Sequence, residues 1–226
     1  MTYPKSILVT GCAGFIGSNF TVQFQKKFPR TKIVGIDDFS GGRRDAVAKN
    51  IIFHEGSVTD EKLLNAIFKK HRIEYIFHFA ALPRVSYSVE HPTETSIANI
   101  IGTVALLEKT RDFGVKRFIF SSSCAIYGDA EKMPTSETNS PPSPMTPYAL
   151  HKYVDERFMK MFGDLFGLDT VALRYFNVFG PGQYGGSAYA TVICNWLEGL
   201  YAKKSMRPFV EGDGTQSRDF CYVDNV

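Results

Sequence analysis

Cysteine is scarce in this chain: its 226 residues include only four, Cys12, Cys124, Cys194 and Cys221. None of them lies in a C-x-x-C pair, which disfavours a zinc ribbon or a dithiol redox motif, and we expect no metal site. Reduced and mostly buried thiols are typical of cytosolic proteins, so the cytoplasm is the compartment that we expect.

Long apolar runs and dense charge runs are also missing. No stretch is apolar for long enough to span a membrane, and residues 1–5 lead straight into a strand pattern rather than a signal-peptide core. The 26 basic and 23 acidic residues are spread along the chain and give a formal net charge of +3. Without a basic cluster, nucleic-acid binding is disfavoured. The apolar share of 44% is ordinary for a soluble globular protein.

Short apolar runs alternate with longer amphipathic stretches. This pattern predicts strands at residues 7–10, 33–36, 51–54, 75–79, 118–121 and 171–174. It predicts helices at residues 15–28, 60–71, 92–113, 146–166 and 189–200. Thr59 is expected to cap the second of these, and Thr146 and Pro147 to open the fourth. Such alternation indicates an α/β protein with a doubly wound parallel sheet, whose ligands bind beyond the carboxyl ends of the strands.

The first predicted strand runs directly into Gly11-x-x-Gly14-x-x-Gly17 and then into a helix. Glycines at this spacing allow a tight turn and a close approach of the backbone to a pyrophosphate, while the helix N-terminus attracts its charge. Glycine-rich turns are common, but this one lies between a strand and a helix, which is the context that a dinucleotide site requires. We therefore predict a Rossmann-type dinucleotide site.

Asp37 and Asp38 end the second predicted strand. A carboxylate at this point can accept hydrogen bonds from both ribose hydroxyls of an adenosine and would repel a 2′-phosphate, so NAD is favoured over NADP. Arg43 and Arg44 leave an alternative, because an arginine nearby could accept a 2′-phosphate. In a second alternative the two acids are merely loop residues at the end of a strand.

Polar side chains lie just after the fifth predicted strand and again at the start of the predicted helix at 146–166. Tyr148 and Lys152 are four residues apart and share a helix face, and we expect the lysine charge to lower the pKa of the tyrosine. A tyrosine with a lowered pKa could act as a base near neutral pH, and Ser123 could bind the same substrate hydroxyl. By itself Tyr-x-x-x-Lys is also a chance pattern on a helix surface. Its position downstream of a dinucleotide motif favours catalysis.

These motifs together resemble the extended short-chain dehydrogenases/reductases, in particular the NAD-dependent sugar-nucleotide epimerase/dehydratase family. The resemblance runs along the whole chain. Besides the residues above, it rests on residues 77–81, on Asn99 with Gly102 and Thr103, and on residues 173–180 and 212–220. It implies that residues 1–178 form an NAD-binding Rossmann domain and residues 179–226 the beginning of a small C-terminal substrate lobe. We expect the remainder of that lobe to be absent.

The resemblance also implies roles for individual residues. Cofactor contacts are expected from Gly11, Gly14, Phe15, Ile16, Gly17, Asp37, Asp38, Ser40, Ser57, Val58, Phe79, Ala80, Ala81, Leu82, Asn99, Ser121, Tyr148, Lys152 and Tyr175. Substrate contacts are expected from Arg84, Val85, Ser86, Ser123, Tyr148, Asn177 and Arg218. One position departs from the family: Ser57 stands where an aspartate is common, so the contact to the adenine amine is weaker or runs through water.

The resemblance implies a reaction class as well. Dehydratases and decarboxylases of this family carry an acid just after the catalytic Ser or Thr, where this chain has Cys124 and Ala125. The expected reaction is therefore NAD-dependent epimerisation at C4 of a UDP-sugar through a 4-keto intermediate, with Tyr148 as the base. The expected substrates are UDP-GlcNAc/UDP-GalNAc or UDP-Glc/UDP-Gal. A UDP-uronate 4-epimerase, another sugar-nucleotide oxidoreductase and a catalytically incomplete NAD-binding fragment are the alternatives.

The predicted helices at 92–113 and 146–166 resemble a pair that forms a four-helix dimer interface in this family. We therefore expect a homodimer. In the alternative, their apolar faces only cover the sheet.

Overall fold

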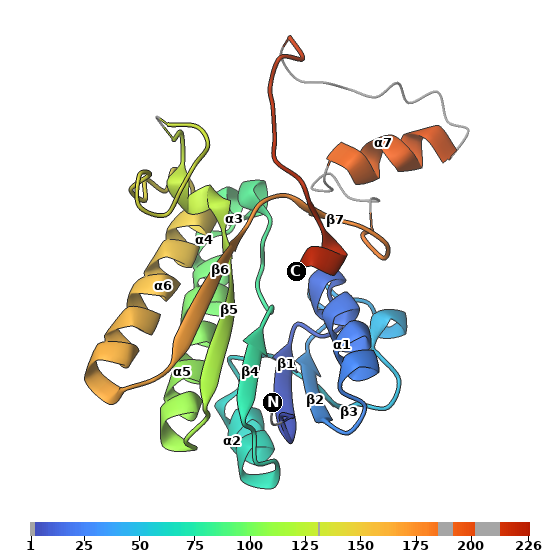
Figure 1. Ribbon diagram of the computed structural model, residues 1–226, viewed down its shortest axis with the longest axis vertical. Helices are drawn as coiled ribbons and strands as arrows, with labels where there is room; N and C mark the ends of the chain where they lie inside the picture. The colour runs from blue at the N-terminus through green and yellow to red at the C-terminus, as the bar shows by residue number, and fades with distance from the viewer. Residues whose placement is uncertain (1–2, 131, 185–191, 202–212) are drawn as a thin grey trace.

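The computed structural model describes residues 3–130, 132–184, 192–201 and 213–226. Six strands form its central sheet in the order β3-β2-β1-β4-β5-β6 (Figure 1). Their bounds are β1 Ser6–Thr10, β2 Lys32–Asp37, β3 Ile52–Glu55, β4 Tyr75–His78, β5 Arg117–Ser123 and β6 Thr170–Tyr175. All pairings in this sheet are parallel. The strand order reverses between β1 and β4, so the predicted doubly wound α/β sheet is confirmed, and its ligand crevice is expected at that reversal.

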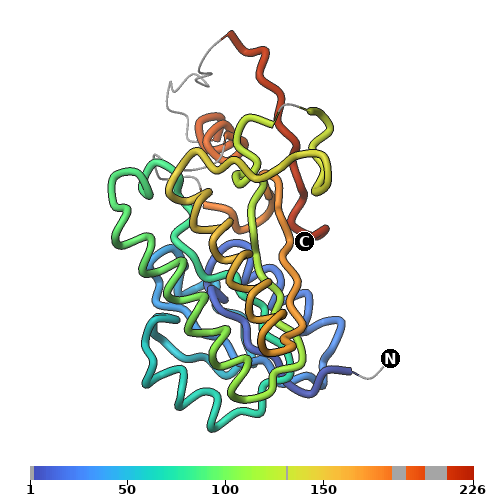
Figure 2. Tube along the Cα trace, turned by 90° about the vertical axis from the view of Figure 1, so that its left-hand side faces the viewer, coloured from blue at the N-terminus to red at the C-terminus, as the bar shows by residue number. Residues whose placement is uncertain are grey.

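Helices cover both faces of the sheet. Helix α1 (Phe15–Lys27) packs its Phe20 and Phe24 against Phe77 on one face, with ring centroids 4.4 and 5.7 Å from that of Phe77. Helices α2 (Glu61–Lys70), α5 (Gly102–Asp112) and α6 (Pro147–Phe166) cover the other face, where the larger apolar core lies. Figure 2 shows α5 and α6 side by side on this face.

The helix ends test the capping predictions. Asp60, and not Thr59, caps α2: its carboxylate accepts a hydrogen bond from the backbone N–H of Leu63 at 3.0 Å. The Thr59 hydroxyl lies instead 2.9 Å from that of Ser57, so the prediction of a Thr59 cap is wrong. The prediction for α6 is confirmed, because Thr146 accepts from the N–H of Ala149 at 3.3 Å and Pro147 is the first helical residue.

The predicted helix at 92–113 is present as three successive pieces. These are α4 (Pro92–Ser96), the π-helical segment η2 (Ile97–Ile101) and α5. A wider π-helical turn within a helix often marks a functional position, and this one carries Asn99. A short helix that the sequence pattern did not predict, α3 (Val85–Glu90), precedes them.

Shorter elements complete the described chain. They are the 3-10 turns η1 (Arg44–Ala46), η3 (Cys124–Tyr127) and η4 (Val223–Asn225), the strands β7 (Val178–Phe179) and β8 (Cys221–Tyr222), and helix α7 (Val192–Tyr201). β7 and β8 pair in parallel as a second, two-stranded sheet. Of the predicted helix at 189–200, residues 189–191 lie outside the described part. No helix in the described ranges is both long and apolar enough to cross a membrane.

Candidate active site

The glycine motif forms a tight loop between β1 and α1. Gly11 has φ +66°, and a Cβ there would lie 2.7 Å from the backbone nitrogen of Ala80. A Cβ on Gly17 would collide with the carbonyl oxygen of Gly11, which fixes how closely α1 starts beside the loop. Phe15, Ile16 and Gly17 form the first turn of α1, where N–H groups have no partner within the helix. The loop is therefore a backbone cradle of the kind that binds a pyrophosphate.

Asp37 ends β2 directly beside this loop and is almost fully buried. One of its carboxylate oxygens accepts from the N–H of Ala13 at 2.9 Å and the other from the N–H of Phe39 at 2.8 Å. Burial raises its pKa, and these backbone hydrogen bonds offset part of that rise. Asp38 is exposed and accepts from the N–H of Ser40. Asp37 thus joins the glycine loop to the end of β2.

The two arginines that could have accepted a 2′-phosphate are already paired. Arg44 makes two hydrogen bonds to the carboxylate of Glu55, at 2.8 and 2.5 Å, and its guanidinium lies 4.3 Å from the ring centroid of Phe39. Arg43 makes two hydrogen bonds to Asp45, at 2.9 and 2.5 Å. The geometry therefore favours NAD, because a 2′-phosphate would compete with these carboxylates for the arginines and would be repelled by them.

Asn99, from the π-helical segment, fixes the chain that follows β4. Its side-chain oxygen accepts from the N–H of Leu82 at 2.7 Å, and its amide nitrogen donates to the carbonyl of Leu82 at 3.2 Å. The same nitrogen lies 3.3 Å from Nδ1 of His151, whose Nε2 lies 2.9 Å from the hydroxyl of Ser96. Asn99 therefore lies behind the wall of the pocket and holds the backbone of Leu82, which lines it. His151 is the buried partner of Asn99, and the sequence patterns did not indicate it.

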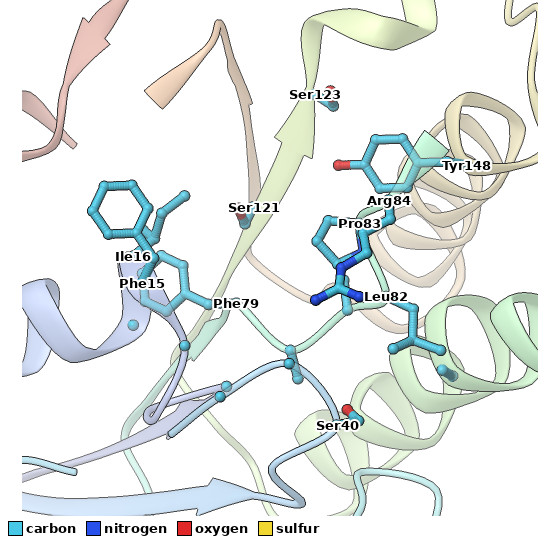
Figure 3. A pocket seen from close by; sticks show the side chains of 18 of the residues that line it. Phe15, Ile16, Ser40, Phe79, Leu82, Pro83, Arg84, Ser121, Ser123 and Tyr148 are labelled. Carbon is cyan, nitrogen blue, oxygen red and sulfur yellow. The ribbon is translucent and has the colours of Figure 1, made fainter. Parts of the chain in front are cut away.

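The predicted catalytic residues come together at the C-terminal end of β5 and the N-terminal end of α6. In Figure 3 the hydroxyl of Tyr148 points into the pocket, with Ser121 and Ser123 on the strand across from it. The Lys152 ammonium is buried, donates to the carbonyl oxygen of Ser121 at 2.8 Å, and lies 5.9 Å from the ring centroid of Tyr148. The side chain of Ser123 caps the turn η3 by accepting from the N–H of Ala125.

The electrostatics of Tyr148 differ from expectation. Burial raises its pKa to about 12, and a hydrogen bond with Ser123 only partly offsets this. In the protein alone the pKa of Tyr148 is therefore raised and not lowered as predicted, because desolvation of the phenolate is the largest contribution. Burial also lowers the pKa of Lys152 itself. To act as a base at neutral pH, Tyr148 would consequently need a further positive charge nearby.

Neighbouring elements hold these residues in place. The N–H of Tyr148 donates to the hydroxyl of Ser88, which is fully buried on α3, at 3.0 Å. Glu156 on α6 accepts from Ser122 of β5 at 2.5 Å, and from Arg174 of β6 at 3.0 and 2.7 Å. Arg174 also donates to the hydroxyl of Tyr127 in η3, at 2.8 Å. These contacts join α3, α6, β5, β6 and η3 around the site.

A single pocket of about 520 Å³ contains most of the predicted site. Of the predicted cofactor residues, Gly11, Gly14, Phe15, Ile16, Gly17, Asp37, Asp38, Ser40, Ser57, Val58, Phe79, Ala80, Ala81, Leu82, Ser121, Tyr148, Lys152 and Tyr175 line it. Of the predicted substrate residues, Arg84, Val85, Ser123, Tyr148 and Asn177 line it. Lining residues that the motifs did not indicate are Ile36, Gly41, Gly42, Gly56, Pro83, Ala98, Ser122, Cys124, Ala125, Val178 and Gln183. The volume lies within the range of small-molecule and cofactor sites.

The predicted residues outside this lining are Asn99, Ser86 and Arg218. Asn99 lies behind the wall, as described above, and Ser86 lies in the first turn of α3. Arg218 lies in the exposed segment 213–220 and donates to the carbonyl of Ser217. Gly212, which begins the last motif, lies outside the described residues. The structure therefore does not bring Arg218 into the pocket with Asn177, whose side chain donates to the carbonyl of Asp219.

The described pocket fits NAD. A glycine cradle that side chains would fill lies at the N-terminus of α1, and Asp37 stands at the end of the neighbouring strand, where ribose hydroxyls would be bound. Tyr148 and Lys152 lie further along the same pocket, where a nicotinamide and its ribose would meet a substrate.

Comparison with known proteins agrees with this geometry. Residues 7–226 match the model of the NAD dependent epimerase/dehydratase family. A putative UDP-glucose 4-epimerase of Methanocaldococcus jannaschii is 34% identical over 97% of this chain and 70% of its own length. The solved UDP-glucose 4-epimerase of Thermotoga maritima, crystallised with UDP-glucose, is 40% identical with a TM-score of 0.91, over 97% of this chain and 70% of that one.

A second solved structure is the UDP-N-acetylglucosamine 4-epimerase of Methanobrevibacter ruminantium M1, in complex with UDP-N-acetylmuramic acid. It is 36% identical with a TM-score of 0.90, over 99% of this chain and 70% of that one. The match to the family model covers nearly the whole chain. This chain belongs to the NAD-dependent epimerase/dehydratase family.

Proposed function

We propose that this protein interconverts the C4 epimers of a UDP-sugar, with UDP-GlcNAc/UDP-GalNAc and UDP-Glc/UDP-Gal as the candidate pairs. The observation that carries the proposal is the composition of the pocket around Tyr148. Among the lining residues of the described chain, the only carboxylates are Asp37, the last residue of β2, and Asp38 directly after it, and both lie at the opposite end of the pocket. Beside Ser123 lie Cys124 and Ala125 instead, and burial raises the pKa of the Cys124 thiol, which keeps it protonated.

Dehydration or decarboxylation needs an additional acid or base next to the sugar, whereas epimerisation needs one base and a reversible hydride store. When bound, NAD supplies that store by exchanging a hydride with C4 of the sugar. Tyr148 takes the proton of the C4 hydroxyl. It returns the proton after the 4-keto sugar has rotated in the site and presents its other face. Ser123 orients the same oxygen, and the Lys152 ammonium favours the Tyr148 phenolate. The proton and the hydride both return to the sugar, so the reaction is balanced without a second substrate.

The substrate side of the pocket supports this assignment. Arg84 and Val85, at the start of α3, and Asn177, after β6, line the pocket near Tyr148 and would contact the sugar and the diphosphate. We propose that residues 1–178 are the cofactor-binding domain and residues 179–226 part of a substrate lobe. The main sheet ends with β6, and the next strand, β7 (Val178–Phe179), crosses this boundary and pairs with β8 in the separate two-stranded sheet.

We also propose a homodimer formed through the helical run of η2 and α5 together with α6. Large apolar side chains are exposed there on both helical runs: Ile97, Ile101, Leu150, Met161 and Leu165 are between 47% and 66% exposed. Exposed apolar clusters of this kind are commonly covered by a partner protein. The four cysteines are free thiols, which agrees with a reducing compartment such as the cytoplasm. Sedimentation of the wild-type chain and of an Ile101→Lys variant tests the dimer, and a monomeric wild-type chain would refute it.

The test of the reaction is incubation of the protein with each UDP-sugar and analysis of the products by NMR. We expect the C4 epimer to form without net production of NADH. Tyr148→Phe should lower the rate by at least about a hundredfold, since it removes the base. Tyr153→Phe is the matched control on the same helix, because Tyr153 lines a different groove, and its rate should stay at the wild-type level.

The alternatives predict different results. NADH accumulating in proportion to an oxidised sugar would identify a net oxidoreductase. Conversion of UDP-uronates alone would identify a uronate epimerase. Tight NAD binding without any turnover would refute the enzymatic proposal.

A further inference from the structure

Asp155 is a buried carboxylate that the reaction described above does not use. It lies on α6, three residues after Lys152, and is fully buried. Neither of its side-chain oxygens has a hydrogen-bond partner among the described residues. Leaving a carboxylate in such a position costs several kcal/mol unless a nearby charge compensates it, on the order of the effective penalty for burying an ion. Its surroundings therefore should contain that charge.

Lys152 is the buried cation nearest to Asp155 along α6, because residues three apart share a helix face. The Lys152 ammonium donates to the carbonyl of Ser121, and neither Asp155 oxygen has a hydrogen-bond partner among the described residues, so the two side chains are not in contact. They interact through a buried region of low polarity, where a charge acts over a longer distance than in water. Burial raises the pKa of Asp155 and lowers that of Lys152, and in each case the charge of the other residue opposes the shift.

Two carboxylates act on Lys152, and Asp155 is the one that no arginine or other lysine of the described chain is seen to pair with. Glu156 also favours a charged Lys152, but Arg174 of β6 neutralises it through two hydrogen bonds. On β4, His78 is buried and its pKa is lowered to about 3, so it is neutral.

The remaining neighbours add no anion to the pair. His151 lies on α6 with its pKa lowered by burial, and Tyr148 is protonated in the protein alone. The charge of Asp155 also raises the pKa of Tyr148 directly, so the effect of Asp155 is read at Lys152 and not at the tyrosine. From α5 the residue that acts on Asp155 is Thr103, which is uncharged and whose hydroxyl donates to the carbonyl of Asn99 at 2.6 Å.

We propose that Asp155 is a positioning residue of the active site, which keeps the buried Lys152 ammonium charged and thereby sets the pH range in which Tyr148 accepts the substrate proton. Without an anion nearby, a buried ammonium loses its proton more readily. A neutral lysine would not stabilise the Tyr148 phenolate, and burial would then hold that tyrosine in its protonated form. Asp155 thus acts on the chemistry through Lys152. The inference rests on the proposed role of Tyr148 as the base.

The decisive variant is Asp155→Asn, which preserves the shape of the side chain and removes its charge. The ionisation of Lys152 in the NAD-loaded protein is measured by carbon-13 NMR of its ε-carbon, with the signal assigned from its loss in Lys152→Met. We expect Asp155→Asn to move this titration downward by about one pH unit or more. The alkaline limb of the pH profile of kcat should move down with it, while KM for the UDP-sugar stays within about twofold. An unchanged titration in a folded Asp155→Asn protein would overturn the proposal.

Asp164→Asn is the matched control. Asp164 lies on the same helix but is exposed and paired with Lys160, so its replacement should leave both profiles unchanged. An equal shift in this control would show that net charge, and not the buried pair, is responsible.

A second measurement covers the case in which Asp155→Asn does not fold. The carboxyl carbon of Asp155 can be titrated by carbon-13 NMR in the wild-type protein and in Lys152→Met. We expect an aspartate pKa well above the ordinary value, raised further in Lys152→Met. An Asp155 pKa that does not respond to Lys152→Met would overturn the proposal. Both titrations are independent of turnover, so they decide this inference even if no UDP-sugar is converted.

Discussion

Gly11 offers a direct test of how closely the glycine loop packs against the site wall. In Gly11→Ala, two costs add. The residue must keep φ near +66°, which costs an L-residue about 1–2 kcal/mol. Its new Cβ would also lie 2.7 Å from the nitrogen of Ala80 and 2.9 Å from the carbonyl carbon of Phe79, both of them backbone atoms that cannot rotate away. Overpacking of this kind costs about 1–3 kcal/mol.

Gly114 is the matched control for this variant. It has φ +62°, but a Cβ there would meet no heavy atom within 4 Å. Gly114→Ala should therefore show only the backbone cost, reduced by about 0.4–1 kcal/mol because alanine has less freedom in the unfolded chain. We expect Gly114→Ala to lose about 1 kcal/mol of unfolding free energy and Gly11→Ala about 2–4 kcal/mol, measured by urea denaturation.

NAD affinity separates the two variants further. The loop can accept the Gly11→Ala methyl only by moving away from residues 79–80, and both segments line the cofactor pocket. A displacement that costs at least about 1.4 kcal/mol of binding free energy weakens NAD binding tenfold, and this is the minimum that we expect by calorimetry. Gly114→Ala should bind NAD as the wild type does. Equal stability losses in the two variants, or unchanged NAD affinity in Gly11→Ala, would refute the close approach of loop and wall.

Other predictions concern the supporting contacts. Glu156→Gln should lower the unfolding free energy by about 1.5–3 kcal/mol, because hydrogen bonds to a charged partner are lost in a largely buried position; urea denaturation would measure this loss. Thr146→Ala should cost about 1 kcal/mol through loss of the α6 cap, whereas Thr59→Ala should cost much less. His78 has its pKa lowered to about 3 by burial, so the unfolded chain binds its proton first, and stability should fall as the pH drops from about 6.5 towards 3; His78→Gln should flatten that slope. Glu55→Gln should weaken the discrimination against NADP, measured as the ratio of the two cofactor affinities, because it frees the guanidinium of Arg44.

Local rules predicted the nucleotide half of the site well. The glycine spacing, the acid at the end of β2 and the cap of α6 each depend on residues within a few positions of one another. The failure at Thr59 has a local cause too, since Asp60 offers a stronger acceptor one residue later and Ser57 occupies the threonine hydroxyl. The short helix α3 escaped prediction because its six residues make fewer than two helical turns, too few to show a repeating apolar face.

The substrate half depends on contacts between distant segments. His151 contacts Asn99, 52 positions away, and Tyr148 is held by Ser88, 60 positions away. Burial itself is a tertiary property, so the raised pKa of Tyr148 could not follow from its spacing to Lys152. What the motif predicts is proximity; the sign of the pKa shift depends on how much water the fold removes.

One signal in the sequence does point to Asp155. Helix α6 buries a continuous stripe at spacings of four and three, formed by Tyr148, Lys152, Asp155, Met159 and Phe162. Met159 and Phe162 of this stripe pack into the apolar core, whereas Tyr148 and Lys152 lie at the proposed active site. At the junction a core position would ordinarily carry an apolar residue, so a carboxylate there is costly unless it compensates another buried charge. An acid within an apolar stripe, one turn from a functional lysine, therefore predicts an electrostatic role from the spacing of the side chains alone.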